Sequence, residues 1–399
     1  MSFSQRIPGH RFLHSPGPTR VPDEVIHAMS RQPMDMADPR FHSVIRACES
    51  GLKRLLQTEK SDVFMYACNG HGAWEAVISN LIAPGAAALI PGTGHFSDSW
   101  AVQTEALGGR VVRTPYVEGF PIDPAAVEEA LRADARHDIV AVFVVHTDTA
   151  SGITSDLRAI RAAINGAGHP ALLVVDVVAS LGAAPFAMDE LGVNVILGAS
   201  QKGLMTPPGL GFVGVDERAY SLAAANPAPR YYWDWRLRRG EHAYQKFCGT
   251  APQTLLAGME AALDLIFREG LDQVFARHAQ LAAAVRAAIA AWSQGGALRL
   301  FCQAPEACSS SVTTVLLNPD INPEDIRTLA RERYQVAIAG GLGALTGRAF
   351  RIGHLGDVNA AMILGSLAGV EAALSQLGIP YGRDGVAQAV AALTTPPRA

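Results

Sequence analysis

Short apolar runs alternate with helix-like segments through the middle of this 399-residue chain. Most of the runs are nearly continuous in Val, Ile and Leu, which is typical of strands covered on both faces. They predict strands at Ala87–Ile90, Arg110–Thr114, Ile139–His146, Leu172–Val178, Val193–Gly198 and Gly211–Val215. Helical patterns fall between them at Ala73–Leu81, Pro124–Arg132 and Ser155–Ala163. This alternation predicts an α/β fold with a large, mainly parallel sheet covered by helices.

The C-terminal third of the chain has a different pattern. Longer helices are predicted there, with short strands among them, at Leu255–Glu269, Leu271–Trp292, Ser311–Leu317, Pro323–Glu332 and Ala349–Ile352. The chain is long enough for two domains. We therefore expect an N-terminal arm at residues 1–20, a large domain at residues 21–260 and a smaller α+β domain at residues 261–399.

Composition excludes several other classes of protein. With 49% hydrophobic and 18% charged residues, the chain can form a large core, and its net charge of -4 gives no sign of a nucleic-acid partner. No apolar run reaches the ~18 residues of a membrane span, and the N-terminus lacks the pattern of a secretory signal. The five cysteines form no CxxC pair, and the histidines show no metal-ligand spacing. We expect a cytoplasmic protein without a metal site or a membrane partner.

Two polar residues stand out at the predicted sheet. Asp176 interrupts the run Leu172–Val178, and Lys202 follows the run Val193–Gly198. A carboxylate buried without a partner would cost several kcal/mol, so a cationic group should meet it. Pyridoxal phosphate (PLP) requires a lysine for its Schiff base and a carboxylate for its pyridine nitrogen, so we assign these catalytic roles to Lys202 and Asp176. The alternatives are a surface lysine after a strand and a structural ion pair between Asp176 and an arginine.

Three loops carry residues suited to such a cofactor, and each follows a strand-like run, the first of which is Val63–Ala67. Cys68–Gly72 precedes a helix, whose free N–H groups and dipole favour an anion. Phe96 and Thr149 follow other strands, where ligands of parallel sheets bind, and they suit ring stacking and hydrogen bonding. The alternatives are a helix-capping turn, an aromatic packed under a loop, and an ordinary turn with Ser155 as the helix N-cap.

Arg351 follows a flexible glycine-rich segment, Gly340–Gly343. An arginine in this setting suits bidentate binding of a substrate carboxylate. The alternative is a structural arginine.

Taken together, these residues resemble the class V aminotransferases of the fold type I PLP enzymes, specifically the alanine–glyoxylate and serine–glyoxylate group. The match runs from Ser15-Pro16-Gly17-Pro18-Thr19 to Arg351-Ile352-Gly353-His354-Leu355-Gly356 and covers most of the chain. The resemblance implies a seven-stranded sheet and a homodimer with shared active sites. The implied contacts are Asn69, Gly70, His71 and Gln201 at the phosphate, Phe96 and Val178 on the ring faces, Thr149 near the ring, Arg351 at the substrate carboxylate, and Thr250 at the neighbouring subunit's phosphate.

The chain departs from the family pattern at four places. Asn69 replaces a small hydroxyl residue, and Asp148 stands where relatives often have Glu. Phe247 replaces a phosphate-binding Tyr, and Met34–Phe41 differs from a segment near the substrate entrance. We expect substrate choice to depend on Met34–Phe41 and Tyr231–Trp235.

The resemblance implies transamination between an amino acid (serine, alanine, aspartate or similar) and a small 2-oxo acid, glyoxylate or pyruvate. One alternative is other chemistry on the same fold, either a β-elimination lyase or a cysteine desulfurase with Cys302 or Cys308 as nucleophile. However, desulfurases have Ser-His-Lys at the Schiff-base lysine, where this chain has Ser200-Gln201-Lys202. Another alternative is a non-catalytic PLP-binding regulator, although the sequence carries no DNA-binding segment.

Overall fold

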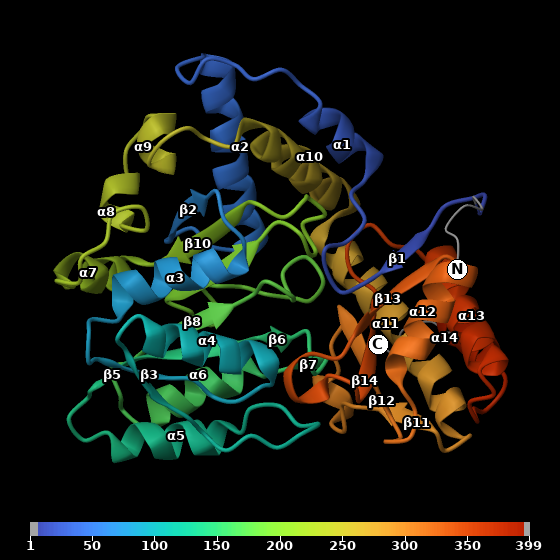
Figure 1. The fold of residues 1–399 in the computed structure, drawn as a ribbon. Helices are drawn as coiled ribbons and strands as arrows, with labels where there is room; N and C mark the ends of the chain where they lie inside the picture. Colours follow the sequence, from blue (N-terminus) through green and yellow to red (C-terminus); the bar gives the residue numbers. More distant parts are fainter. Residues whose placement is uncertain (1–6, 395–399) are drawn as a thin grey trace.

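A seven-stranded sheet forms the centre of the larger part of the molecule in the computed structural model, which describes residues 7–394 (Figure 1). Residues 1–6 of the predicted arm and residues 395–399 lie outside the described part. β10 runs antiparallel to both of its neighbours, and all the other adjacent strands of this sheet run parallel to each other. The predicted mainly parallel sheet is therefore confirmed. The strand order is β2 (Asp62–Tyr66), β10 (Gly211–Val215), β9 (Val195–Ala199), β8 (Leu172–Asp176), β5 (Ile139–Val145), β3 (Ala87–Leu89) and β4 (Arg110–Val112).

Both faces of this sheet are buried, as the apolar runs predicted. In β5, Val142 and Val144 pack into one core cluster, whereas Phe143 and Val145 pack into the cluster on the opposite face. This alternation follows from the two-residue period of a strand. The first face is covered by α2 (Pro39–Leu56), α5 (Pro124–Ala133), α6 (Leu157–Gly166), α9 (Ala243–Phe247) and α10 (Gln253–Glu269), and the second by α3 (Gly70–Leu81), α4 (His95–Ala106), α7 (Glu217–Ala225) and α8 (Trp235–Arg238).

Side-chain caps fix where several of these helices begin. The α6 cap is Asp156, whose carboxylate accepts hydrogen bonds from the N–H groups of Arg158 and Ala159 at 2.9 and 3.1 Å. The proposed Ser155 cap is therefore wrong, since the Ser155 hydroxyl instead accepts the Ile122 N–H at 3.3 Å. Asp satisfies the free N–H groups of a first turn as well as Ser does, so local sequence did not separate the two.

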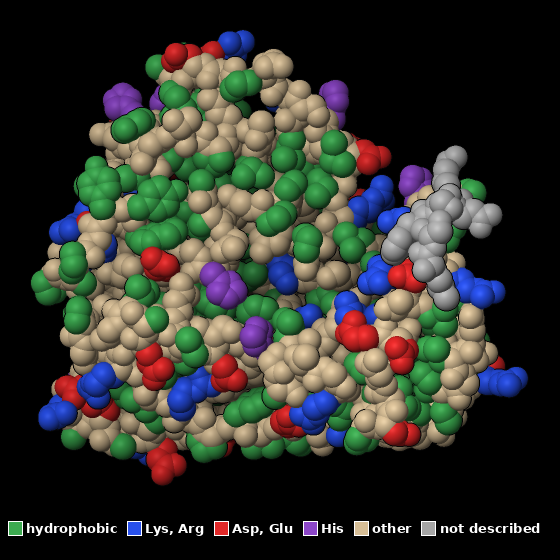
Figure 2. Space-filling view, in the orientation of Figure 1, with side chains coloured by type: hydrophobic (Ala, Val, Ile, Leu, Met, Phe, Trp, Pro, Cys, Tyr) green, Lys and Arg blue, Asp and Glu red, His purple; other side chains and the backbone are tan. Residues whose placement is uncertain are grey.

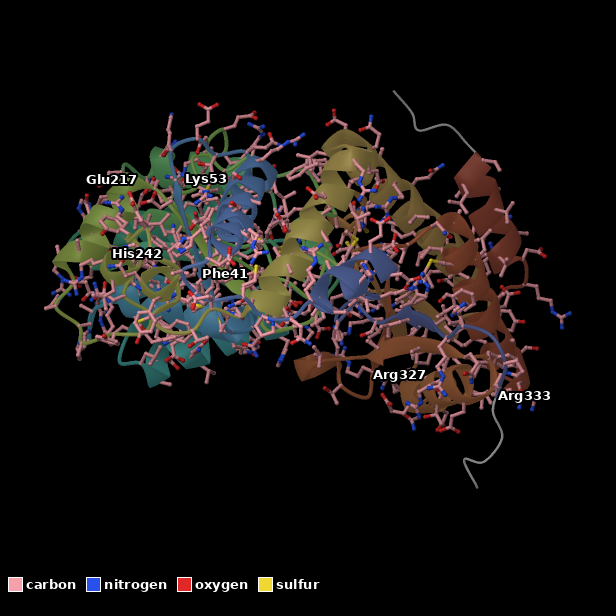
Figure 3. All side chains as sticks on the ribbon, turned by 90° about the horizontal axis from the view of Figure 1, so that it is seen from above. Phe41, Lys53, Glu217, His242, Arg327 and Arg333 are labelled. Atoms are coloured by element: carbon pink, nitrogen blue, oxygen red, sulfur yellow. The ribbon has the colours of Figure 1, made fainter. Side chains whose placement is uncertain are left out.

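A second sheet of five strands forms the C-terminal part, in the order β1 (Phe12–His14), β13 (Val336–Gly340), β14 (Ala349–Gly353), β12 (Val312–Leu317) and β11 (Leu298–Leu300). It packs against α11 (Leu271–Ser293), α12 (Pro323–Arg333), α13 (Ala360–Gln376) and α14 (Gly385–Thr394). In Figure 3, Arg327 and Arg333 lie on α12 in this part, away from Phe41 on α2. The α/β fold class with a smaller C-terminal α+β part is confirmed.

The N-terminal segment connects the two parts. β1 pairs in parallel with β13 of the small sheet. The chain then contacts the loop after β9 of the large sheet, where the Thr19 N–H donates to the Gln201 carbonyl, and continues into α1 (Asp23–Met29), which packs against α10. The boundaries at residues 20 and 260 remain predictions. No helix of the described residues is long and apolar enough to cross a membrane.

Candidate active site

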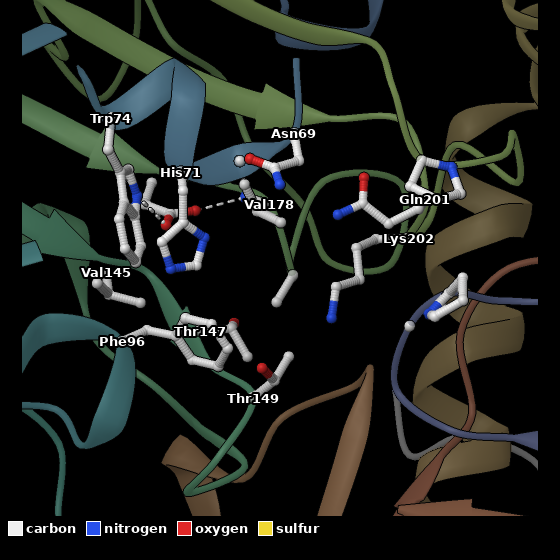
Figure 4. Close-up of a pocket in the computed structure, with 16 residues that line it drawn as sticks. Asn69, His71, Trp74, Phe96, Val145, Thr147, Thr149, Val178, Gln201 and Lys202 are labelled. Carbon is white, nitrogen blue, oxygen red and sulfur yellow. Dashed lines mark hydrogen bonds between the residues drawn. The ribbon is translucent and has the colours of Figure 1, made fainter. Parts of the chain in front are cut away.

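A cavity of about 260 Å³ lies where the carboxyl ends of β5, β8 and β9 meet the N-terminus of α3. Figure 2 shows the surface hollowed near the middle of this face, with histidine and basic side chains at the hollow. Carboxyl ends of parallel strands share one edge of a sheet, so the loops after them converge on one ligand. The cavity brings together Asn69, Gly70, His71, Phe96, Thr149, Asp176, Val178, Gln201 and Lys202, all predicted from the sequence (Figure 4).

Lys202 lies in the turn after β9, and its side chain extends into the cavity (Figure 4). Its Nζ donates a hydrogen bond to the Pro16 carbonyl of the N-terminal segment. Burial lowers the pKa of Lys202 to about 8, and the positive charge of Arg351 acts in the same direction. The amine therefore loses its proton far more readily than an exposed lysine, as a nucleophile or base requires.

The N-terminal segment holds the Lys202 turn through several contacts. Thr19 donates from its hydroxyl to the Lys202 carbonyl at 3.0 Å and from its N–H to the Gln201 carbonyl at 3.1 Å. A Cβ at Gly17 would lie 2.5 Å from Lys202 Cδ, and Gly17 has a φ of 126°, so glycine is needed at this close approach. The segment is therefore part of the cavity wall.

Asp176 ends β8 and is buried, with 4% of its surface exposed. Its Oδ1 accepts the Val178 N–H at 2.7 Å, and its Oδ2 accepts the Trp74 indole N–H at 2.8 Å. Burial raises its pKa to about 6, while these hydrogen bonds oppose that rise. The charged groups acting on it are Asp148 and Lys202, so a structural ion pair with an arginine does not explain its burial.

The first turn of α3 forms the anion-binding site that the sequence predicted at Cys68–Gly72. The Asn69 side chain caps the helix by accepting the Gly72 N–H at 3.2 Å. Within residues 7–394, the N–H groups of Gly70 and His71 bond to no protein acceptor, and the buried Gln201 Oε1 has no partner. Free N–H groups at a helix N-terminus bind anions. The unpaired Gln201 Oε1 is an acceptor and needs a hydrogen-bond donor, whereas the NH2 group of the same amide can donate to an anion.

Asp148, one of the four departures, joins two cavity loops. Its carboxylate accepts hydrogen bonds from the Phe96 N–H at 2.9 Å, the Thr93 hydroxyl at 3.1 Å and the Ala150 N–H at 2.8 Å. It lies in the hairpin of β6 (Thr147–Asp148) and β7 (Ile153–Thr154), next to Thr149. Asp148 therefore fixes Phe96 on one side of the cavity and Thr149 on another.

Arg351 and Thr250 lie outside the cavity wall of the described chain. Arg351 is buried beside it, donating from Nε to the Gly340 carbonyl at 2.6 Å and from Nη1 to the Thr149 carbonyl at 2.9 Å. Burial lowers its pKa to about 10, partly opposed by Asp148. Thr250 is exposed in the segment before α10.

The sequence did not single out several residues that line the cavity, namely Gly17, Pro18, Trp74, Val145, Thr147, Ala179 and Pro208. Trp74 carried a usable signal, because it stands four residues after Gly70 and so projects from the same helix face. The segments expected to set substrate choice do not line the cavity in this chain: Phe41 and Trp235 are core residues, and Tyr231 is 74% exposed. Phe247 is likewise buried in the core.

The cavity thus presents a reactive amine, a buried carboxylate and an anion site around an apolar slot between Phe96 and Val178. These groups fit the aldehyde, the ring nitrogen, the phosphate and the flat ring of PLP. Cys302 and Cys308 do not line it, which removes the support for a desulfurase.

Comparisons with known proteins agree with this chemistry. The family model described as Aminotransferase class-V matches residues 11–350. A serine–glyoxylate aminotransferase of Methylorubrum extorquens is 39% identical over 379 residues, covering 94% of this chain and 93% of that protein. An L-aspartate–glyoxylate aminotransferase of Paracoccus denitrificans is 38% identical, with coverage of 92% and 91%. A solved ureidoglycine–glyoxylate aminotransferase of Bacillus subtilis has a TM-score of 0.88 at 26% identity, covering 98% of this chain and 100% of that one.

Proposed function

Because this chain belongs to the class V aminotransferases and is thus an enzyme, we propose that it uses PLP to transfer an amino group from an amino acid to glyoxylate. The observation that carries the proposal is the single cavity shared by Lys202, Asp176 and the α3 N-terminus. The relatives named above support glyoxylate as acceptor and serine or aspartate as donor. Pyruvate is the second acceptor to test, and alanine the third donor.

Four residues of the cavity have a direct role in this reaction. Lys202 would hold the cofactor at its aldehyde carbon, Asp176 at its ring nitrogen, and Gly70 and Gln201 at its phosphate. When bound, the cofactor accepts the amino group and withdraws electrons from the substrate's Cα. The Lys202 amine, once displaced from the cofactor by the incoming amino acid, would take the Cα proton as a general base and, as an acid, deliver it to the carbon that was the cofactor's aldehyde.

A half-reaction screen tests this function. The purified protein is loaded with PLP, and serine, alanine or aspartate is added without an acceptor while the cofactor absorption is recorded. We expect at least one donor to bleach the absorption band, and glyoxylate or pyruvate to restore it. A protein that binds no PLP, or whose band responds to none of these donors, would contradict the proposal.

The pH dependence of cofactor capture follows from the Lys202 environment. Only the neutral amine attacks an aldehyde, so the rate of PLP incorporation into the apoprotein should rise about tenfold per pH unit at low pH. It should level off near pH 8, where the lowered pKa of Lys202 lies. Stopped-flow absorbance between about pH 6 and about pH 10 measures this profile. A midpoint near the ordinary lysine value of about 10.4 would contradict the predicted environment.

We also propose that the enzyme is a cytoplasmic homodimer in which Thr250 contacts the phosphate bound by the partner subunit. Thr250 is exposed and does not line the cavity of its own chain. Nearby segments expose large apolar side chains, with Tyr231 at 74%, Tyr244 at 67% and Leu237 at 42%. Exposed apolar side chains of this size, when they gather, mark interaction surfaces.

Hybrid dimers test the shared site. Thr250→Asp would bring a negative charge to the phosphate, so this variant should bind PLP weakly, whereas Thr250→Ser should bind it normally. Co-expressed with Lys202→Ala, it should form hybrids that regain activity, because one of their two sites then has both native residues. Hybrids with no gain over either variant alone, or an active monomer in sedimentation, would refute the arrangement.

A further inference from the structure

Trp74 is a cavity residue to which the proposed reaction gives no role. It stands one turn into α3, on the face that also carries Gly70, and Figure 4 shows it beside His71 at the cavity. Nε1–H donates to Asp176 Oδ2 at 2.8 Å. Trp74 is 2% exposed and Asp176 is 4% exposed. Water therefore hardly competes for this bond, and hydrogen bonds to an ionised group are strong in such surroundings.

Neighbouring rings fix the indole of Trp74. It stacks on Trp100 with a centroid distance of 5.6 Å and an angle of 10°, and Trp100 stacks on Phe143 at 4.6 Å and 19°. Phe96 and His71 contact the same indole at centroid distances of 6.2 and 4.4 Å. The position of the Trp74 N–H is therefore set by packing, and it does not depend on a bound ligand.

The carboxylate of Asp176 has acceptor sites to spare for a ligand. Two carboxylate oxygens offer about four lone-pair sites. Within the described part of the chain, the donors to this carboxylate are the Val178 N–H on Oδ1 and the Trp74 N–H on Oδ2. Both favour the ionised form, which burial opposes. Removal of the Trp74 donor would leave the cost of burial less compensated.

Other titratable groups around Asp176 do not replace this donor. Asp148 disfavours its charge and Lys202 favours it, both through space. His71 belongs to the first turn of the same helix as Trp74 and packs against the Trp74 indole. His146 donates its backbone N–H to the Asp176 carbonyl, and its ring is occupied with the Ser180 hydroxyl at 2.9 Å.

We infer that Trp74 is a positioning residue whose indole N–H keeps Asp176 ionised and oriented, so that the proton between Asp176 and the cofactor ring stays on the ring nitrogen. This inference rests on the proposed function. The two groups share one proton: on nitrogen it gives a cationic ring and a carboxylate, and on Asp176 it gives two neutral groups. A cationic ring withdraws electrons better, so Trp74 acts on the reaction through Asp176.

Two variants separate this role from simple packing. Trp74→Phe keeps an aromatic ring but removes the N–H. Trp100→Phe is the matched control, because Trp100 belongs to the same stack and its buried Nε1 has no hydrogen-bond partner among the described residues.

The first readout uses the full chain without cofactor. Selective 15N labelling of its five tryptophans gives one indole N–H resonance for each. We expect the Trp74 resonance to move with a midpoint near pH 6 as Asp176 ionises, to disappear in Trp74→Phe and to keep titrating in Trp100→Phe. Asp176→Asn should leave the resonance in place but stop it from titrating, which gives the same test if Trp74→Phe does not fold.

The second readout uses PLP labelled with 15N in its ring. The ring nitrogen should be protonated in the wild type and in Trp100→Phe, and shift toward the unprotonated value in Trp74→Phe, with kcat about tenfold or more lower. An identical ring signal in the two variants, or an indole that does not titrate, would overturn the inference. Failure of wild-type PLP binding would overturn the proposed function, while the apoprotein titration would still report the Trp74–Asp176 bond.

Discussion

Lys202→Ala should lower the transamination rate by at least about a thousandfold, because one side chain holds the cofactor and moves the substrate proton. The characteristic absorption of the lysine-bound cofactor should also be absent. Lys246→Ala is the matched control, since Lys246 pairs with Glu49 at 2.6 Å and does not line the cavity. Single-turnover absorbance after mixing with a donor measures the loss.

A small primary amine should restore part of the Lys202→Ala rate by occupying the space that the side chain leaves. Rescue of this kind separates a missing base from a misfolded cavity. Retention of the wild-type rate would contradict the role of Lys202 and would point to another base in the cavity. His71 is the group to consider in that case, since burial lowers its pKa and it lines the same space.

Most strands of the large sheet were predictable, because a strand buried on both faces is a continuous apolar run that can be recognised by itself. Val142 and Val144 need one apolar layer and Phe143 another, and this requirement can be read without knowing the neighbouring strands. The pairing and direction of the strands could not be predicted in this way. The antiparallel direction of β10 and the pairing of β1 with β13 depend on contacts between distant segments, which periodicity does not encode.

The same distinction applies to the cavity. Asp176 and Lys202 were found because a polar residue in or after a buried strand needs a reason to be there. Trp74 was missed because a tryptophan in an apolar helix is first interpreted as a core residue, and only its spacing of four residues from Gly70 indicates the cavity. The contact of Pro16 with Lys202 joins residues 186 positions apart, and nothing local to either residue indicates it.

Arg351→Ala should raise KM for both the amino acid and glyoxylate by about a hundredfold, while PLP affinity changes little. Loss of a buried, charge-assisted pair costs about 3 kcal/mol, which corresponds to that factor. Arg351 Nη2 bonds to no acceptor in residues 7–394, whereas Nε and Nη1 are held by the Gly340 and Thr149 carbonyls. These bonds leave Nη2, together with the second N–H of Nη1, to donate to a carboxylate.

Two further variants make the Arg351 result specific. Arg348→Ala removes an arginine three positions earlier that pairs with Glu118 at the surface, at 3.0 and 3.2 Å, so its KM values should stay near wild type. Arg351→Lys keeps the charge but has no planar fork, and it should recover only part of the substrate affinity. Because Arg351 also bonds the Thr149 carbonyl, its loss can disturb the cofactor side of the cavity. Equal losses of PLP and substrate affinity in Arg351→Ala would therefore show that this arginine supports the cavity wall and does not bind the substrate.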